Sequence, residues 1–379
     1  MAQCQWASAH LVLVRARKAA ADPFLKAEIF QKDAEALRYL GRFLESLSCY
    51  RKSHFLYKKL LIPSESLSCL LGMSACLRVL GRYGEARRMW ARGLPPSLPQ
   101  VELERALVAR GLGRFKETEH RIARALKRLQ RKNTESARSD LQHAYWISGG
   151  LARFTGYFPK AIKAFGEAAR LARHSGDVSA EAFALCGMAG VERILGNVRA
   201  SLSNYRTAHR LLKKLGDPFG EAYGLCGQAN ALRTFGEASL SLPLYRRSAR
   251  LYQRLGDESS EAFAHWGMGG SFRRLNRFPS ALAAYKRALR LFIKSKDDRG
   301  RVMTHLGLAR VAEAKGHPRA ALRQAVVGLA AARRAQLRYE TALARYEIGR
   351  LRRPDHPPTH LLKLMGISPT VVRRWRDIP

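Results

Sequence analysis

Apolar side chains recur along this chain at helical spacing, and the helical pattern itself recurs at a fixed distance. In residues 199–214 the apolar and small positions lie three or four residues apart, which places them on one face of a helix. This set consists of Leu202, Tyr205, Ala208 and Leu212. An equivalent set eighty residues later consists of Leu282, Tyr285, Ala288 and Phe292. The pattern therefore predicts amphipathic helices in regular succession.

Turn-forming residues divide these helices at intervals of forty residues. They are Gly156, Gly196, Gly236, Asn276 and Gly316. Two further columns keep the same interval, and they consist of Gly187, Gly227, Gly267 and Gly307, and of Phe165, Tyr205, Tyr245 and Tyr285. The register extends through Gly41 and Gly81, and more loosely through Gly113. A fixed period of this size is typical of stacked repeats that bury their apolar faces against one another, and it predicts eight units.

Each unit is predicted to be a pair of antiparallel helices. Asp177 is a suitable N-cap for a helix that ends near Ile194, and a second helix is expected from about Arg199 to Lys214. Pro243 lies seven residues beyond the turn at Gly236, inside a second helix, and is expected to kink or shorten it.

The predicted organisation has five parts. They are an N-terminal segment (1–23), N-terminal repeats (24–92), an irregular short repeat (93–136), regular forty-residue repeats (137–350) and a C-terminal capping segment (351–379). The proline-rich run GLPPSLPQ at 93–100 and the run RRPDHPP at 352–358 mark two of these boundaries.

The repeat resembles the tetratricopeptide repeat. A small residue precedes the turn, and a small residue, an aromatic and another small residue follow it, as at Ala189, Ser201, Tyr205 and Ala208. The forty-residue period and the linker L-G-D-x-x-x-E-A at 215–222 and 255–262 resemble the longer, kinesin-light-chain-like subtype, although the usual proline after the second helix is missing. The resemblance covers about residues 24–350. It implies an all-α, right-handed superhelical solenoid of about eight stacked helix pairs, which acts as a protein–protein interaction scaffold through its concave wall.

The net positive charge of the chain favours partners that carry negative charge. Lys and Arg total 68 against 30 Asp and Glu, a formal net charge of +38, which favours acidic protein, nucleic acid or an anionic membrane surface. No apolar run approaches the roughly 18 residues of a membrane-spanning helix, and we expect no membrane insertion. Six cysteines without metal-ligand spacing fit reduced thiols in a cytoplasmic protein. Phosphate-binding and zinc-protease motifs are missing from the sequence, so neither an enzyme nor a bound cofactor or metal is expected.

Arginine stands three residues before the turn in seven consecutive units, and we call this set the arginine column. Its members are Arg38, Arg78, Arg110, Arg153, Arg193, Arg233 and Arg273, and Glu313 breaks the column in the eighth unit. The resemblance implies that this position borders the concave wall, where the column would attract an acidic chain. An arginine in the last turn of a helix also interacts favourably with the helix dipole, which is a purely structural explanation.

Aromatic residues accompany the arginine column on the predicted first helices. The candidate groove residues are Trp146, Phe183, Tyr223, Asn230, Phe263 and Trp266. Aromatic side chains beside arginines suit peptide anchors and also stacked bases. Packing between repeats is the alternative explanation for each of them.

Two functions remain open from the sequence. The first is a scaffold that binds an acidic peptide or protein in the arginine-lined groove. The alternative is a nucleic-acid-binding or DNA-linked regulatory protein that uses the same groove and residues 359–379, which resemble a helix-turn-helix. In that alternative Gly366-Ile367-Ser368 form the turn and Pro369 to Arg376 form the reading helix, with Arg373, Arg374 and Arg376 near DNA. A short capping helix over the last repeat is the plainer interpretation of this tail.

Overall fold

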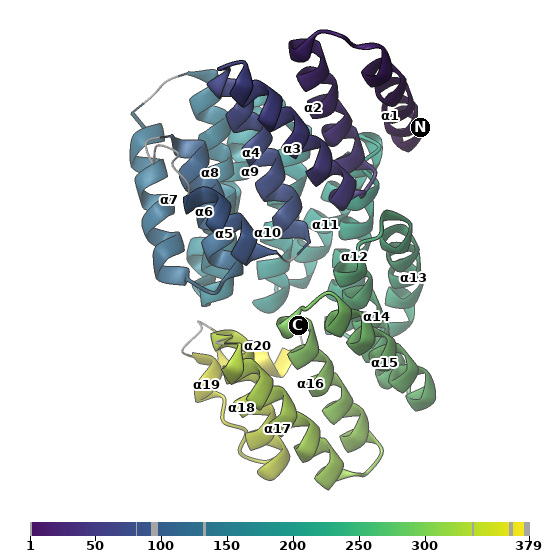
Figure 1. Cartoon of the computed structure of the whole chain (residues 1–379). Coiled ribbons are helices and arrows are strands. Elements are labelled where there is room, and N and C mark those ends of the chain that lie inside the picture. The colour runs from purple at the N-terminus through teal and green to yellow at the C-terminus, as the bar shows by residue number, and fades with distance from the viewer. Residues whose placement is uncertain are drawn as a thin grey trace. The chain divides into compact units, whose positions relative to one another are not determined.

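Helices account for all the regular secondary structure in the described part of this computed structural model (Figure 1). The structure describes residues 2–80, 82–91, 98–131, 134–335, 337–363 and 367–374. The helices are α1 (Ala2–Ala19), α2 (Pro23–Tyr39), α3 (Phe43–Lys59), α4 (Pro63–Val79), α5 (Tyr83–Ala91), α6 (Pro99–Gly111), α7 (Phe115–Leu129), α8 (Glu135–Thr155), α9 (Phe158–Ser175), α10 (Val178–Ile194), α11 (Val198–Lys214), α12 (Pro218–Thr234), α13 (Ala238–Leu255), α14 (Glu258–Arg274), α15 (Phe278–Lys294), α16 (Asp298–Ala314), α17 (Pro318–Arg334), α18 (Arg338–Arg352), α19 (His360–Lys363) and α20 (Pro369–Arg374).

The chain divides into two compact units, each a stack of antiparallel helix pairs. Unit 1 comprises residues 1–132 and 215–218, and unit 2 comprises residues 133–214 and 219–379. Unit 1 contains the pairs α2/α3, α4/α5 and α6/α7, with α1 packed on α2. Unit 2 contains five pairs, from α8/α9 to α16/α17, followed by α18 and two short helices. The predicted all-α solenoid of about eight helix pairs is confirmed.

The predicted turns adopt the backbone conformation that their residues favour. Gly156, Gly196, Gly236 and Gly316 have positive φ angles of 85°, 78°, 108° and 75°. Asn276 takes the same place with a φ of 56°, as expected of the non-glycine residue that best tolerates the left-handed region. The Gly81 turn lies outside the described residues.

Acidic caps begin three of the first helices of unit 2, including the predicted cap at Asp177. The Asp177 carboxylate accepts a hydrogen bond of 2.9 Å from the Ala180 backbone N–H at the start of α10. Asp257 and Asp297 cap α14 and α16 in the same way, at 3.0 and 2.8 Å. These carboxylates satisfy N–H groups that have no partner inside the helix, and they face the positive end of its dipole.

Aromatic rings of second helices insert against glycines of the following first helices, and this contact explains two of the repeating columns. A Cβ added at Gly187 would lie 2.4 Å from the Phe165 ring, and one added at Gly267 would lie 2.2 Å from the Tyr245 ring. The same relation links Tyr205 with Gly227 and Tyr285 with Gly307. The aromatic always lies 22 residues before its glycine. Only glycine leaves enough space for the ring at this distance.

One element differs from its sequence prediction. The helix α13 runs from Ala238 to Leu255 with Pro243 inside it, so proline does not shorten it. Both Pro243 and Ser239, whose carbonyl would accept a hydrogen bond from residue 243, are exposed. Water therefore replaces the hydrogen bond that proline cannot donate.

Both ends of the repeat array are covered by additional helices. At the N-terminal end the buried Asp33 of α2 accepts contacts from His10 and Arg17 of α1, which tie α1 to the stack. At the C-terminal end Ile367 and Val372 are 0% and 8% exposed and belong to the main hydrophobic cluster of unit 2. The described part of the tail therefore packs on the array.

Candidate functional site

The arginine column occupies the last turn of every first helix from α2 to α14. In unit 1 its members are Arg38, Arg78 and Arg110, and in unit 2 they are Arg153, Arg193, Arg233 and Arg273. This placement matches the sequence prediction for the helices. The environments of the individual guanidinium groups, however, differ from one unit to the next.

Several members of the column have partners within the protein. Arg78 forms two hydrogen bonds with the Glu104 carboxylate in the next repeat, at 3.1 and 3.0 Å. Arg38 lies 3.5 Å from the Tyr50 hydroxyl of its own repeat. Arg233 is 1% exposed, donates to the Tyr245 hydroxyl at 3.1 Å and stacks 4.6 Å from the centre of the Trp266 ring.

These partners all lie on a different helix from their arginine, so the sequence of one helix does not reveal them. Glu104 lies 26 residues after Arg78, and each tyrosine lies 12 residues after its arginine. The twelve-residue spacing between arginine and aromatic was visible in the repeat and could have indicated this structural role. In the eighth unit the charges are exchanged, because Glu313 accepts two hydrogen bonds from Arg350 of α18 at 2.6 and 2.7 Å.

Arg193 differs from these members because part of its guanidinium is buried without a hydrogen-bond partner. Its Nε and Nη1 atoms are buried, and neither has a hydrogen-bond acceptor among the described residues. Arg153, in the preceding repeat, has a cation–π contact with Phe154 at 5.6 Å and no ion pair in the described part of the chain. Leaving a buried donor unsatisfied costs about 1–3 kcal/mol, and more when the group is charged.

Gly190 provides the space in which the Arg153 guanidinium lies. A Cβ at Gly190 would lie 3.1 Å from Nη1 of Arg153 and 3.3 Å from the Tyr205 hydroxyl. In the structure this glycine accommodates two side chains of the protein.

The last regular helix of unit 2 approaches its first one, which brings residues distant in sequence to a common inner face. Helix α18 contacts α8, and the Arg299 guanidinium lies 5.4 Å from the centre of the Phe154 ring. Burial raises the pKa of Tyr339 to about 12, and the nearby charges of Arg299 and Arg193 act against this rise. We call this set, Arg153, Phe154, Arg193, Arg299 and Tyr339, the inner face of unit 2.

Tyr339 provides a second unsatisfied group on the inner face. The side chain is 8% exposed, and its buried hydroxyl meets no hydrogen-bond partner within the described ranges. The sequence contains no signal for this residue, for Phe154 or for Arg299, because only the curvature of unit 2 brings Arg299 near Phe154 and Tyr339 near Arg193.

The predicted aromatic anchors are mostly packed against other side chains. The Phe183 and Tyr223 rings lie 6.3 Å apart, and both contact Phe219 at 6.4 and 6.3 Å. Phe263 packs edge-on against Phe292 at 4.7 Å. These three anchors are half-buried, and Trp146 is half-buried as well.

Two of the candidates are held by hydrogen bonds in the protein. Trp266 is 6% exposed and its Nε1 donates to the Met303 carbonyl at 2.9 Å. The Asn230 side-chain oxygen accepts from the Tyr245 hydroxyl at 2.7 Å. Both therefore contribute to the packing of unit 2.

The proposed reading helix of the tail is short. Helix α20 comprises six residues, Pro369–Arg374, while Gly366 and Arg376 lie outside the described residues. Across the described part of the chain, no cluster of three or more His, Cys, Asp or Glu side chains could hold a metal ion. No described helix has the length and apolar character needed to cross a membrane.

Comparisons with known proteins agree with this geometry. The family model described as Tetratricopeptide repeat matches residues 219–294, which form most of α12 to α15. No curated protein matches the chain.

Several solved structures share the fold at low sequence identity. A Rap protein complexed with Competence and Sporulation Factor is 14% identical, with a TM-score of 0.62 over 82% of this chain and 88% of that chain. NprR in complex with its cognate peptide NprX is 14% identical, with a TM-score of 0.58 over 79% and 86%. The APC/C hetero-tetramer Cut9-Hcn1 is 16% identical, with a TM-score of 0.61 over 88% and 59%.

These likenesses establish the fold alone, and the kinesin-light-chain-like subtype stays a prediction. The helix pairs covered by the family model recur along unit 2 with the same left-handed turns and the same contact between aromatic and glycine. Residues 219–294 therefore match the tetratricopeptide repeat, and the other helix pairs of unit 2 share its fold.

Proposed function

We propose that the chain is a non-catalytic interaction scaffold that binds an acidic peptide segment at the inner face of unit 2. Arg193 is partly exposed, so a partner carboxylate could pair with the accessible part of its guanidinium, whose Nε and Nη1 atoms meet no acceptor among the described residues. Hydrogen bonds between charged groups are worth about 1.5–3 kcal/mol each in such settings. The unsatisfied Arg193 guanidinium is the observation that carries this proposal.

The solved relatives support a peptide as the partner. NprR was crystallised with its cognate peptide and the Rap protein with Competence and Sporulation Factor, so the same fold accommodates such partners. The net charge of +38 favours an acidic partner over a basic one. We also assign the protein to the cytoplasm, where five of the six cysteines, which are free and buried, would stay reduced.

Two members of the arginine column provide a matched test. Arg193→Gln removes the unsatisfied charge, whereas Arg233→Gln removes a guanidinium that is bonded in the core. We expect Arg193→Gln to weaken binding of a labelled peptide of about ten residues, rich in Glu, by about tenfold, and to leave the thermal midpoint equal or higher. Arg233→Gln should lower the midpoint because the Tyr245 hydroxyl and the Trp266 ring lose their partner.

Fluorescence anisotropy and thermal unfolding measure the two effects on the same preparations. Arg254→Gln, which changes an exposed residue of α13, controls for the loss of one positive charge. Equal affinity of the wild-type chain and Arg193→Gln for the peptide would contradict the proposal, as would a lower midpoint for Arg193→Gln.

Nucleic acid is the other outcome that the experiment distinguishes. Deleting residues 359–379 would expose the core that Ile367 and Val372 cover, so substitution of the tail arginines is the cleaner change. If Arg373→Gln with Arg374→Gln abolished binding of a DNA duplex and left peptide binding unchanged, the DNA-linked function would be preferred.

A further inference from the structure

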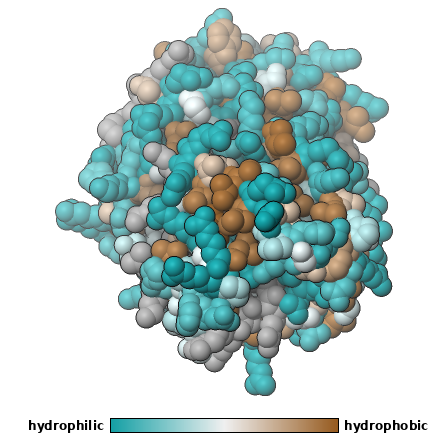
Figure 2. Space-filling model, turned by 90° about the horizontal axis from the view of Figure 1, so that it is seen from below, coloured by the Kyte–Doolittle hydropathy of each residue, from teal (hydrophilic) through white to brown (hydrophobic). Residues whose placement is uncertain are grey.

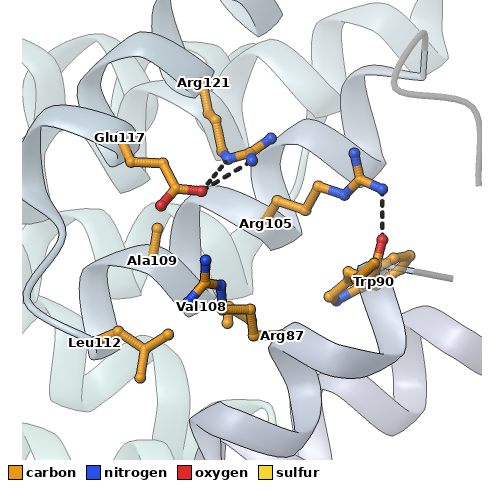
Figure 3. A pocket seen from close by; sticks show the side chains of 9 residues that line it. Arg87, Trp90, Arg105, Val108, Ala109, Leu112, Glu117 and Arg121 are labelled. Carbon is orange, nitrogen blue, oxygen red and sulfur yellow. Dashed lines mark hydrogen bonds and ion pairs between the residues drawn. The ribbon is translucent and has the colours of Figure 1, made fainter.

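A pocket in unit 1 has a charge and a shape that the peptide-binding proposal does not use. Helices α5, α6 and α7 enclose a cavity of about 270 Å³, with side chains from all three helices around it (Figure 3). We call it the α5–α7 pocket. It is lined by Arg87, Trp90, Ala91, Arg105, Val108, Ala109, Leu112, Glu117 and Arg121.

The pocket occurs beside the shortest of the second helices. Helix α5 has 9 residues, whereas α9, α11, α13 and α15 have 17 or 18. It ends at Ala91, shortly before the pair Pro95-Pro96 in the sequence.

A hydrogen bond to helix α5 fixes the position of Arg105. Its Nη2 donates a hydrogen bond of 2.6 Å to the Trp90 carbonyl in the last turn of α5 (Figure 3). A carbonyl is a neutral acceptor, so the positive charge of Arg105 is held at the pocket without being neutralised. The geometry thus fixes a guanidinium in place and leaves its remaining N–H groups available.

The charges around the pocket do not cancel. Arg121 bonds to Glu117 at 3.0 and 2.9 Å and, with Arg124, it also pairs with the fully buried Glu102 at 3.2 and 3.0 Å. Arg87 and Arg105 have no carboxylate in ion-pair distance among the residues that the structure describes. Four guanidinium groups therefore face two carboxylates, and two positive charges remain.

The uncompensated charge also affects Arg105 itself. Burial lowers the pKa of Arg105, and the charges of Arg121 and Arg124 lower it further, against the opposing effect of Glu102. An anion in the pocket would relieve this repulsion. The floor is apolar, because Val108 and Ala109 are buried, so the site also excludes much of the water that would compete with a ligand.

We propose that the α5–α7 pocket binds a phosphomonoester dianion carried by a small molecule. A phosphomonoester has a charge of about −1.5 to −2 near neutral pH, which matches the two unpaired guanidinium groups, Arg87 and Arg105. Arginine suits phosphate because its planar fork donates two parallel hydrogen bonds. The volume is near the lower end of ligand pockets, so the ester group is compact and contacts Val108 and Leu112.

The test titrates the full chain with inorganic phosphate, phenyl phosphate and benzoate, by calorimetry at low ionic strength. Phenyl phosphate should bind in the sub-millimolar range and inorganic phosphate several-fold more weakly, because it lacks the apolar group. Benzoate carries one charge and should bind at least tenfold more weakly than phenyl phosphate.

Two substitutions, one that removes a positive charge and one that removes a negative charge, should change the affinity for phenyl phosphate in opposite directions. Arg87 is exposed and lies outside the core, so Arg87→Gln should fold normally and weaken phenyl phosphate binding about tenfold. Glu117→Gln removes a competing negative charge and should strengthen binding several-fold. Arg51→Gln, at an exposed position of α3, should change affinity less than twofold.

Three outcomes would overturn the proposal. They are the lack of saturable binding by either phosphate, equal affinity for benzoate and phenyl phosphate, or an affinity that neither Arg87→Gln nor Glu117→Gln changes. Circular dichroism of each variant separates these outcomes from loss of the fold. The acidic-peptide site of unit 2 is tested by Arg193→Gln, so failure of one proposal does not imply failure of the other.

Discussion

At the scale of single residues, the pairing of an aromatic ring with a glycine 22 positions later joins one repeat to the next. The ring occupies the volume where a Cβ would stand, and the two helices approach closely as a result. The periodic glycines inside first helices would otherwise weaken those helices, by about 0.5–1 kcal/mol each relative to alanine. Close packing of the ring compensates for that loss.

Two glycines in neighbouring helices of unit 2 test this account. Gly187→Ala places a Cβ 2.4 Å from the buried Phe165 ring, and we expect a loss of about 1–3 kcal/mol in stability from overpacking. Gly166→Ala, in the middle of α9, meets no atom within 4 Å and should stabilise by up to about 1 kcal/mol. Urea midpoints of the two variants measure the difference. Similar midpoints would show that the ring does not require glycine.

At the scale of elements, helix ends carry most of the variation between repeats. The arginine in the last turn of a first helix has a different environment in each repeat. Arg78 of α4 pairs with Glu104, and Arg233 of α12 is buried against Tyr245 and Trp266. Arg193 of α10 has no acceptor at Nε and Nη1 among the described residues. The helix dipole explains why a cation is favourable at this position in every repeat. It does not decide which carboxylate or hydroxyl the cation reaches.

Helix α13 tolerates Pro243 at an energetic cost, and its removal should stabilise the protein. Pro243→Ala restores the backbone N–H that can bond to the Ser239 carbonyl, and it changes an exposed position. We expect a gain of about 1–3 kcal/mol, measured as a higher thermal midpoint. The control is Pro279→Ala in the first turn of α15, where proline is favourable and its loss should not stabilise. A lower midpoint for Pro243→Ala would mean that its ring makes a necessary contact.

At the scale of the whole molecule, net charge is the dominant electrostatic property. The formal charge of +38 opposes compaction, and the face drawn in Figure 2 is largely hydrophilic. Ion pairs such as Arg78–Glu104 and Arg310–Glu347 act in the opposite direction. The balance between these two effects decides how salt changes stability.

Added salt should stabilise the chain. Raising NaCl from about 10 to 300 mM shortens the screening length from about 30 Å to below 8 Å, which weakens long-range repulsion more than short ion pairs. We expect the thermal midpoint to rise by several degrees, as followed by circular dichroism. Choline chloride at equal ionic strength should act equally if screening is the cause. A midpoint that falls with both salts would mean that the ion pairs outweigh the repulsion.

The sequence alone determined the local features of this protein. The positions of turns, caps and buried faces repeat at a fixed interval, so each helix pair could be predicted from its own forty residues, as the Asp177 cap and the turn at Asn276 illustrate. Helix α13 is not shortened by Pro243, because the proline and the carbonyl left without its hydrogen bond are both exposed to water.

Only the tertiary structure decided which arginines have partners. Arg78 meets a carboxylate 26 residues away, and Arg193 lies near Tyr339 of the last regular helix, 146 residues later. Such contacts depend on the curvature of the stack, which adds up from a small rotation between successive repeats. The sequence of a single repeat does not predict this rotation. For the same reason the α5–α7 pocket, which depends on how three helices place Arg87 and Arg105, could not be predicted from the sequence.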